Sequence, residues 1–342
     1  MGDDTIRFLH TSDWHLGAPI NWGPERVAGP WIDRVRGYRQ KAIELIVRLA
    51  IGKRVAAMLV AGDIFDQPEL PDRLKRQSET FLRERVVQPL RDAGTRFVLT
   101  PGTHDCLRGR GSASLTVLKK LAADFTGHVE LLSRGNWGLD IGTEETHVGS
   151  VLISTHPPGD TRRGPWIEFL HSESWSRQGG GPAYRAFGDR HIFTIGAKGA
   201  WHPGAPLSRS TSADNAHSDV GPRFVLIVTV GEAGAAGVQR ELLPVPETAI
   251  LKKDRMRDTW TLFYHRDHEA NSWRRESWSG TATEVVARTK EGLPSVGYVT
   301  LTLDRREDFT VKRMLLTELQ KFGMAIQGSR SGIVSVWLKE SA

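Results

Sequence analysis

Apolar positions in the first third of the chain alternate between short runs and longer, spaced repeats. The short runs at 6–10, 55–60 and 96–100 each end in a polar or glycine-containing turn, as buried strands do where they open into loops. Residues 38–49 and 72–93 carry apolar side chains at i, i+3 and i+4, the spacing of amphipathic helices. The succession strand–helix–strand–helix–strand predicts an α/β layered sheet.

Beyond residue 110 the apolar runs are short and frequent, which predicts further strands. These runs are 129–132, 151–154, 191–195, 224–230 and 242–246. Loops rich in glycine and serine separate several of them, notably 178–182 and 208–221. No internal repeat is visible. The layered sheet therefore gains additional strands before the composition changes.

A Lys- and Arg-rich stretch at 252–257 marks that change. After it, residues 298–303 and 333–338 alternate as strands do, and residues 311–322 have helical spacing. We therefore predict a main domain over residues 1-247 and a small α+β domain over residues 248-342.

Composition is that of an ordinary globular protein, with 342 residues, 39% of them hydrophobic and 25% charged. No apolar run reaches the roughly 18–20 residues of a membrane span, and the N-terminus does not resemble a signal peptide. The single cysteine, Cys106, excludes an internal disulfide and fits a reducing cytosol, so we expect a cytoplasmic protein. A formal charge of +6 permits a polyanionic partner without demonstrating one.

Polar clusters follow each of the first three predicted strands. They are Asp13 with His15, Asp63 behind Gly62, and Thr103, His104 and Asp105 behind Gly102. Carboxylate and imidazole groups delivered by loops at strand ends are what a pair of divalent ions needs for phosphoryl transfer. Each cluster alone is equally typical of surface residues or a turn, but three in succession at strand ends favour a metal site.

Three segments together resemble the SbcD-type exonucleases of the calcineurin-like metallophosphoesterases. They are Phe8-Leu9-His10-Thr11-Ser12-Asp13-Trp14-His15-Leu16-Gly17, then Leu59-Val60-Ala61-Gly62-Asp63-Ile64-Phe65-Asp66, then Pro101-Gly102-Thr103-His104-Asp105. The resemblance implies a layered metallophosphoesterase β-sandwich flanked by helices, followed by a small α+β capping domain. It also implies a two-metal site for Mn²⁺, with Mg²⁺ as the alternative.

The same resemblance assigns roles to individual positions. It makes Asp13 and His15 ligands of one ion and Asp63 the bridge between two ions. His104 protonates the leaving oxygen or steadies the phosphate, and Asp105 fixes the tautomer of His104. Asp66 turns the loop after Asp63. His156, after strand 151–154, serves the second ion, with an ordinary polar strand end as the alternative.

Two positions depart from the family pattern. Thr103 stands where relatives carry an asparagine whose carbonyl binds the second metal. Its hydroxyl is the expected ligand in this position, a shorter and weaker oxygen donor than an amide carbonyl. The strand expected at 191–195 ends at Gly196 without the Gly-His-x-His pair, so the loop carrying that pair looks deleted. His202 offers a replacement ligand, with an exposed loop histidine as the alternative. Lys198 offers a positive charge in place of a metal.

The C-terminal part interleaves basic and aromatic residues. Arg255, Arg257, Arg274 and Arg275 lie near Trp260, Trp273 and Trp278, a pattern that suits phosphate contacts and base stacking. The alternative is a small core of tryptophans under solvated arginines. The resemblance implies DNA as substrate, a homodimer and an SMC-like ATPase partner with a long coiled coil.

Three functions follow from these observations. The first is a metal-dependent DNA nuclease, an exo- or endonuclease, that acts in repair or defence. Its altered ligands would weaken binding of the second ion. The second is a catalytically degenerate nuclease-like subunit that binds DNA or a partner without cutting. The third is a phosphodiesterase for small nucleotides.

Overall fold

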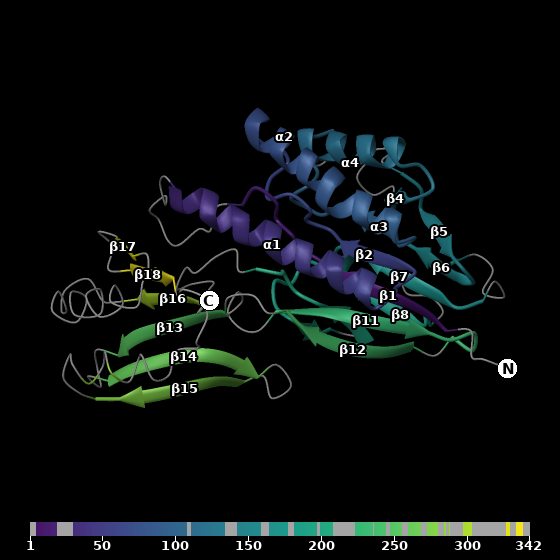
Figure 1. The fold of residues 1–342 in the computed structure, drawn as a ribbon. Coiled ribbons are helices and arrows are strands. Elements are labelled where there is room, and N and C mark those ends of the chain that lie inside the picture. Colours follow the sequence, from purple (N-terminus) through teal and green to yellow (C-terminus); the bar gives the residue numbers. More distant parts are fainter. Residues whose placement is uncertain are drawn as a thin grey trace. The chain divides into compact units, whose positions relative to one another are not determined.

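The structure is a computed structural model, and its described residues form two compact units (Figure 1). The first unit takes in 1–18, 34–207 and 223–243, and the second takes in 19–33, 208–222 and 244–342. The described residues are 5–18, 30–107, 111–133, 142–158, 164–176, 181–196, 199–207, 223–234, 236–243, 247–254, 259–267, 272–279, 284, 287, 297–302, 326–328 and 333–337. The predicted domain boundary after residue 247 falls close to the break at 243/244 and stays a prediction.

A six-stranded mixed sheet forms the centre of the first unit, in the order β12-β11-β1-β2-β3-β4. The four strands β1 to β4 run parallel, and β11 pairs antiparallel with β1. The strands are β1 (Ile6–Thr11), β2 (Ala57–Ala61), β3 (Arg96–Thr100), β4 (Val129–Leu131), β11 (Phe224–Val230) and β12 (Ala236–Leu242). The first three strands confirm the predicted runs, and their carboxyl ends share one edge.

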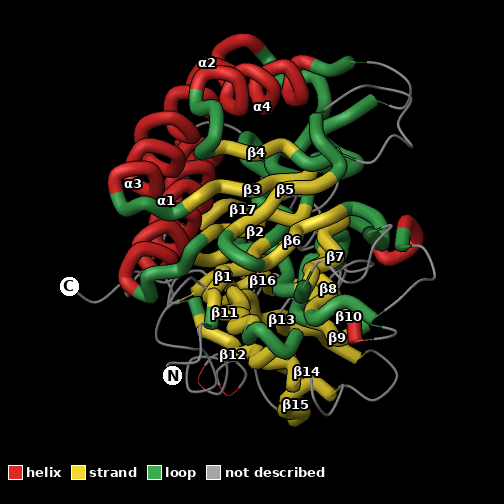
Figure 2. Tube along the Cα trace, turned by 90° about the vertical axis from the view of Figure 1, so that its right-hand side faces the viewer, coloured by secondary structure: helices red, strands yellow, loops and turns green. Residues whose placement is uncertain are grey.

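Helices cover one face of this sheet (Figure 2). They are α1 (Pro30–Gly52), α2 (Asp72–Phe81), the π-helix η1 (Leu82–Val87), α3 (Gln88–Asp92) and α4 (Ala113–Asp124). The helix predicted over 72–93 is therefore one run, α2–η1–α3, with a π-helical turn inside it. None of the described helices combines the length and the apolarity needed to cross a membrane.

A second six-stranded sheet has the order β5-β6-β7-β8-β10-β9. Its strands are β5 (Glu145–Val148), β6 (Val151–Ser154), β7 (Trp166–Leu170), β8 (Tyr184–Phe187), β9 (Thr194–Ile195) and β10 (Ala200–His202). The strand predicted over 191–195 was wrong for residues 191–193, which are not in a strand. The strand before them is β8, which the apolar pattern missed.

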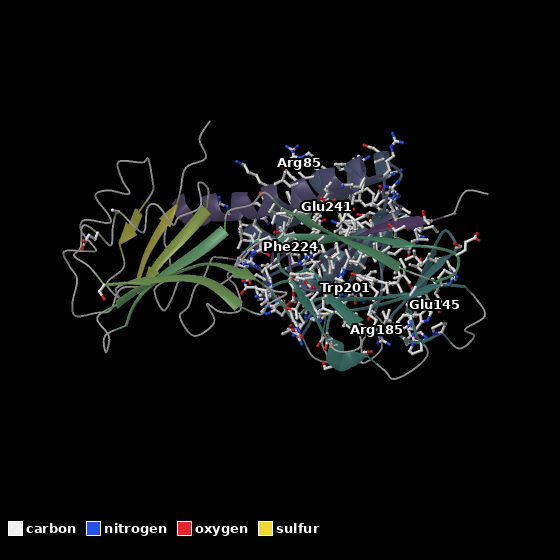
Figure 3. All side chains as sticks on the ribbon, turned by 90° about the horizontal axis from the view of Figure 1, so that it is seen from below. Arg85, Glu145, Arg185, Trp201, Phe224 and Glu241 are labelled. Atoms are coloured by element: carbon white, nitrogen blue, oxygen red, sulfur yellow. The ribbon has the colours of Figure 1, made fainter. Side chains whose placement is uncertain are left out.

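One hydrophobic core joins the two sheets. Phe8, Leu59 and Val98 of the first sheet pack with Ile153 and Ile167 of the second, and all five side chains are fully buried. The partly buried Phe224 and Trp201, labelled in Figure 3, pack against this core. Helices on one side and a second sheet on the other make the predicted layered α/β sandwich.

The second unit contains a separate six-stranded sheet in the order β15-β14-β13-β16-β18-β17. Its strands are β13 (Glu247–Asp254), β14 (Thr259–Asp267), β15 (Ser272–Trp278), β16 (Gly297–Thr302), β17 (Ile326–Gly328) and β18 (Ile333–Trp337). The predicted strands over 298–303 and 333–338 correspond to β16 and β18. The helix predicted over 311–322 lies outside the described residues.

Candidate metal centre

The loops after β1 and β2 run side by side and bring the first two polar clusters together. The backbone N–H of Asp13 donates to the Gly62 carbonyl at 3.0 Å, and that of His15 donates to the Asp63 carbonyl at 2.9 Å. These bonds continue the pairing of the two parallel strands beyond their ends. Asp13, His15 and Asp63 therefore meet at one edge of the sheet, as the sequence predicts.

Three groups of side chains at this edge have ligand atoms within 4.8 Å of one another. We name each after its distinguishing histidine. They are the His191 group (Asp13, His15, His191), the His171 group (Asp13, Asp63, His171) and the His104 group (His15, Asp66, His104). Because Asp13 and His15 each belong to two groups, the three form one continuous centre.

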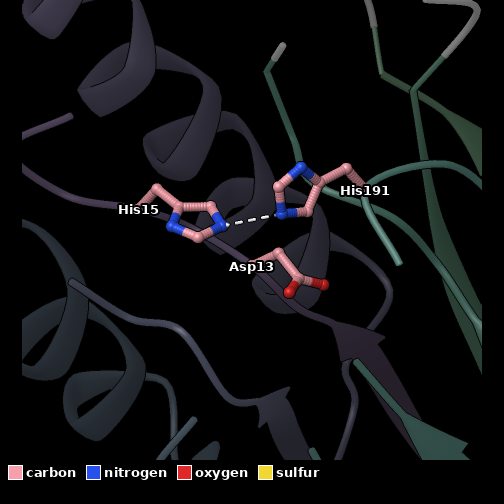
Figure 4. Close-up of side chains that lie close together, drawn as sticks. All are labelled: Asp13, His15 and His191. Carbon is pink, nitrogen blue, oxygen red and sulfur yellow. Dashed lines mark hydrogen bonds between the residues drawn. The ribbon is translucent and has the colours of Figure 1, made fainter. Parts of the chain in front are cut away.

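The His191 group is tightly assembled (Figure 4). The Nε2 atoms of His15 and His191 lie 3.1 Å apart, and the ring centroids are 4.9 Å apart. Two nitrogens bound at about 2.1 Å to one ion, at octahedral or tetrahedral angles, lie roughly 3.0–3.4 Å apart. The spacing of the two rings therefore fits a pair of ligands to a single divalent ion.

The His171 group is looser. His171 directly follows β7, and its Nδ1 lies 3.3 Å from the Ala61 carbonyl oxygen. Its Nε2 lies 3.7 Å from Asp63 Oδ2 and 3.8 Å from Asp189 Oδ1. Burial lowers the pKa of His171, but the surrounding carboxylates outweigh burial and hold that pKa above its usual value.

Asp13 shows that the centre fits a cation. Its Oδ1 accepts the backbone N–H of Asp189 at 3.1 Å, while its buried Oδ2 has no hydrogen-bond donor among the described residues. Burial raises the pKa of Asp13 to about 7, since an uncompensated charge is costly there. A divalent ion would supply the missing charge, and carboxylate with imidazole is a ligand set that such ions accept.

His104 lies on the turn after β3, where its backbone N–H donates to Asp63 Oδ1 at 2.8 Å. Its Nδ1 faces the Asp66 carbonyl oxygen at 2.5 Å, and its ring meets that of His15 edge-on at 5.1 Å. Since a carbonyl only accepts, Nδ1 carries the hydrogen. The acceptor at this nitrogen is thus a backbone carbonyl.

Asp105 does not serve His104 in the predicted way. Its carboxylate accepts the backbone N–H groups of Ile64 at 3.1 Å, Phe65 at 2.8 Å and Gly102 at 2.8 Å. Burial, reinforced by Asp63, raises the pKa of Asp105 to about 7 against the lowering effect of these bonds. Asp105 therefore ties the loop after β2 to the loop after β3, and its predicted role in fixing the His104 tautomer is corrected.

Backbone strain is concentrated in the centre. Four of the five non-glycine residues with positive φ in the described part are Asp13 at 53°, His15 at 46°, Asp63 at 48° and Asp189 at 68°. The left-handed region is unfavourable for residues with a Cβ. Such strain persists only where the surroundings over-determine it and typically marks functional sites.

Two glycines leave space for the ligands. A Cβ on Gly62, which has a φ of +80°, would lie 2.2 Å from His171 Nδ1. A Cβ on Gly102 would lie 2.1 Å from Asp63 Oδ1. The positions of His171 and Asp63 therefore require glycine at the neighbouring residues 62 and 102.

Several predicted site residues lie elsewhere. His156 is 32% exposed, with Nδ1 3.6 Å from Glu144 Oε2, and belongs to none of the three groups. Thr103 is exposed on the turn that carries His104. His202 is buried, and its two ring nitrogens face the Gly188 carbonyl at 2.5 Å and Glu173 Oε1 at 2.6 Å. Neither nitrogen of His202 is directed at the groups, which corrects its prediction as a ligand.

The predicted DNA contacts lie in the second unit. Arg255 and Arg257 lie outside the described residues. Arg274 and Arg275 lie on β15, where they pair with His265 and Phe263 of β14. Lys198, predicted as a substitute for a metal, also lies outside the described residues.

Sequence reasoning missed His171 and the role of His191. His171 directly follows β7, a strand whose apolar run is interrupted by Glu168. Glu168 is buried and pairs with Arg185 at 2.5 Å. His191 ends the sequence Gly188-Asp189-Arg190-His191, directly after β8. The loop predicted to be deleted is therefore present. It reads Gly-Asp-x-His and keeps one histidine, with Asp189 at the position of the other.

Comparison with known proteins agrees with this geometry. Residues 6–193 match the calcineurin-like phosphoesterase family. The chain is 30% identical over 168 residues to the DNA double-strand break repair protein Mre11 of Aeropyrum pernix, covering 48% of this chain and 36% of the relative. It is 32% identical over 137 residues to the SbcD subunit of the nuclease SbcCD of Rhodobacter capsulatus, covering 40% of this chain and 29% of the relative.

The matches therefore span about a third of the length of these relatives. Among solved structures, TT1561 of Thermus thermophilus is similar at a TM-score of 0.36 and 12% identity, over 69% of this chain and 99% of the other.

Proposed function

The chain belongs to the calcineurin-like phosphoesterase family, and we propose that it is a metal-dependent nuclease that hydrolyses phosphodiester bonds in DNA. The observation that carries the proposal is the continuity of the three ligand groups through Asp13 and His15. The names of the relatives, a DNA double-strand break repair protein and a nuclease subunit, support DNA as the substrate.

The ligand assignment follows the groups. Asp13, His15 and His191 would hold one ion, and His171 with Asp63 the other. Asp63 Oδ2 lies 3.9 Å from His15 Nε2 and 3.7 Å from His171 Nε2, a position between the groups that suits a bridging carboxylate. Two such ions, Mn²⁺ or Mg²⁺, would activate a water and would stabilise the charge that develops in an in-line phosphoryl displacement.

His104 is the proposed proton donor to the leaving oxygen. Its Nδ1–H is held by the Asp66 carbonyl, so proton transfer takes place at Nε2. The hydrogen bond from its backbone N–H to Asp63 Oδ1 fixes the turn relative to the bridging carboxylate. The proposed acid and the proposed ligand Asp63 thus lie on loops that are joined by a hydrogen bond.

The test is cleavage of linear and circular DNA in Mn²⁺ by wild-type protein and by Asp63→Asn. We expect the variant to lose at least about a hundredfold in rate, as removal of one charge-stabilising group does in other enzymes. Glu144→Gln is the matched control, because Glu144 is a carboxylate beside His156 and outside the three groups. Equal cleavage by wild-type and Asp63→Asn protein would refute the proposal.

A non-cutting, DNA- or partner-binding subunit is the second candidate, and the exposed Thr103 together with Asp189 in place of a histidine favours it. It predicts salt-sensitive DNA binding without turnover in any metal. Hydrolysis of small nucleotides without DNA affinity would instead indicate a small-nucleotide phosphodiesterase.

Partners and location belong to the same proposal. We propose a cytoplasmic protein that acts in DNA repair or defence, as a homodimer, with an SMC-like ATPase as partner. Arg274 and Arg275, on the edge strand β15, stay the proposed DNA contacts together with Arg255 and Arg257.

A further inference from the structure

We propose that His202 is a positioning residue for Asp13 and acts through the peptide bond between Gly188 and Asp189. This inference rests on the metal centre of the proposed function. It concerns a residue outside the ligand groups, on β10, whose buried side chain lies behind the loop of residues 188–191.

One peptide unit links the two side chains. Its carbonyl, that of Gly188, accepts a hydrogen bond from His202 Nδ1 at 2.5 Å. Its N–H, that of Asp189, donates to Asp13 Oδ1 at 3.1 Å. The peptide is trans, so its C=O and N–H point in opposite directions. The two hydrogen bonds together fix the plane of this peptide between His202 and Asp13.

The other side of His202 is also anchored. Its Nε2 faces Glu173 Oε1 at 2.6 Å, and Glu173 begins the 3₁₀ helix η4 (Glu173–Trp175). The Gly188 carbonyl can only accept, so Nδ1 is the donor to it. A continuous chain therefore runs from Glu173 through His202 and one peptide bond to Asp13, and polarisation along such a chain strengthens its members.

The rest of the loop is held independently of His202. The Gly188 N–H donates to the His171 carbonyl at 2.9 Å, and Ser172 Oγ donates to Asp189 Oδ2 at 3.0 Å. The His191 carbonyl accepts from Arg223 at 2.5 Å. His202 holds the carbonyl of Gly188. Losing the His202 side chain should therefore reorient the N–H of Asp189, which belongs to the same peptide, without displacing the whole loop.

The consequence lies at the second oxygen of Asp13. With Oδ1 held by Asp189, the buried Oδ2 has no hydrogen-bond donor among the described residues and is presented to a cation. If the peptide rotates, Oδ1 loses its donor and the carboxylate is no longer fixed. Outer groups that orient ligands in this way typically change metal affinity by about 10- to 100-fold.

The experiment measures Mn²⁺ affinity of the full chain by isothermal titration calorimetry in two matched variants. In His202→Asn the amide nitrogen replaces Nδ1 and still reaches the Gly188 carbonyl. In His202→Gln the amide nitrogen replaces Nε2 and reaches Glu173 instead. We expect His202→Gln to bind the first Mn²⁺ about 10- to 100-fold more weakly, and His202→Asn to retain wild-type affinity.

Tyr184→Phe is the control. Tyr184 is buried on β8, just before the loop, and its hydroxyl bonds His10 Nδ1 at 2.8 Å, outside the chain that reaches Asp13. Its loss should leave Mn²⁺ affinity unchanged. Thermal unfolding in EDTA verifies that each variant is folded before the titration.

Wild-type Mn²⁺ affinity in His202→Gln overturns the inference. An equal loss of Mn²⁺ affinity in His202→Asn and His202→Gln also overturns it, because His202 would then act only by filling space. If neither variant folds, the pair His202→Ala and Glu173→Ala decides, because only the first removes the donor to the Gly188 carbonyl. Weaker Mn²⁺ binding in His202→Ala alone supports the inference, and any other result overturns it. Mn²⁺ binding that depends on His202, in a protein that cuts no phosphodiester, would refute the nuclease and leave this inference intact. A wild-type protein that binds no Mn²⁺ would refute both.

Discussion

The His191 group and the His171 group share Asp13 but differ in how closely their ligands approach. In the first, two imidazole nitrogens lie 3.1 Å apart. In the second, the nitrogen of His171 lies 3.7 and 3.8 Å from its carboxylate neighbours, and the Asp189 side chain is 51% exposed. A site whose ligands already have binding distances loses less entropy when the ion enters. We therefore expect the His191 group to bind its ion first and more tightly.

Removing a direct ligand gives the largest expected effect. His191→Ala should weaken binding of the first Mn²⁺ by at least about a hundredfold. Groups that only orient a ligand change metal affinity by about 10- to 100-fold, and the loss of a ligand itself should cost no less. His171→Ala should leave the first ion bound and remove the second. Calorimetric stoichiometry with Mn²⁺ measures both.

Equal effects of these two substitutions on the first ion would break the comparison, because the groups would then act as one site. The wild-type titration, with two unequal binding steps, is the reference.

Gly62→Ala should affect the His171 group more than the His191 group. The added Cβ would lie 2.2 Å from His171 Nδ1 at a φ of +80°. We expect the free energy of unfolding to fall by about 1–3 kcal/mol and binding of the second ion to be lost. Denaturant unfolding and Mn²⁺ titration report the two quantities.

Gly94→Ala is the matched control, because Gly94 has a φ of +72° with nothing within 4 Å of the added Cβ. It isolates the cost of the backbone conformation, about 1–2 kcal/mol, from the clash. A Gly62→Ala protein that keeps both ions would show that His171 is not a ligand.

Asp189→His should change metal preference at the second ion. Imidazole suits Zn²⁺ and Co²⁺ better than a carboxylate does, so the preference for these ions over Mn²⁺ should rise by about one order of magnitude. Competitive titrations with Mn²⁺ and Co²⁺ measure it, and Asp189→Asn controls for the loss of charge. An unchanged preference would place Asp189 outside the metal's reach.

His156→Ala gives the smallest expected effect. His156 faces Glu144 outside the three groups, and substitutions at such surface positions change free energies by about 0.5 kcal/mol or less. Mn²⁺ affinity should stay within about twofold of wild type. A hundredfold loss would instead restore His156 as the histidine of the second ion and displace His171.

The strongly patterned part of the chain was predictable. Strands β1, β2 and β3 contain short, mainly apolar runs. The residues that follow them, Asp13 and Asp63 among them, were expected to converge. Parallel strands place their carboxyl ends at one edge, so position after a strand is enough to locate these side chains.

The second sheet was harder because its strands break the apolar pattern. In β7, Glu168 interrupts the run and is tolerated only through Arg185 on the neighbouring strand β8. Because Glu168 and Arg185 place a charged residue in each strand, the apolar pattern does not reveal β7 or β8. Without them, neither His171 nor the sequence from Gly188 to His191 could be assigned to a strand end. The role of Asp105 was missed for a related reason, since its partners are backbone N–H groups of another loop.

The left-handed backbone at Asp13, His15, Asp63 and Asp189 lowers the stability of the folded chain at the centre. Each of these residues adopts a conformation that glycine would adopt at lower cost, by about 1–2 kcal/mol per position. Exchange of any of these residues for glycine would relieve that strain, but would also remove a group that a cation could bind or that orients one. Under the proposed function, the strain is retained because the ion requires these side chains, a trade-off between activity and stability that is common in enzymes.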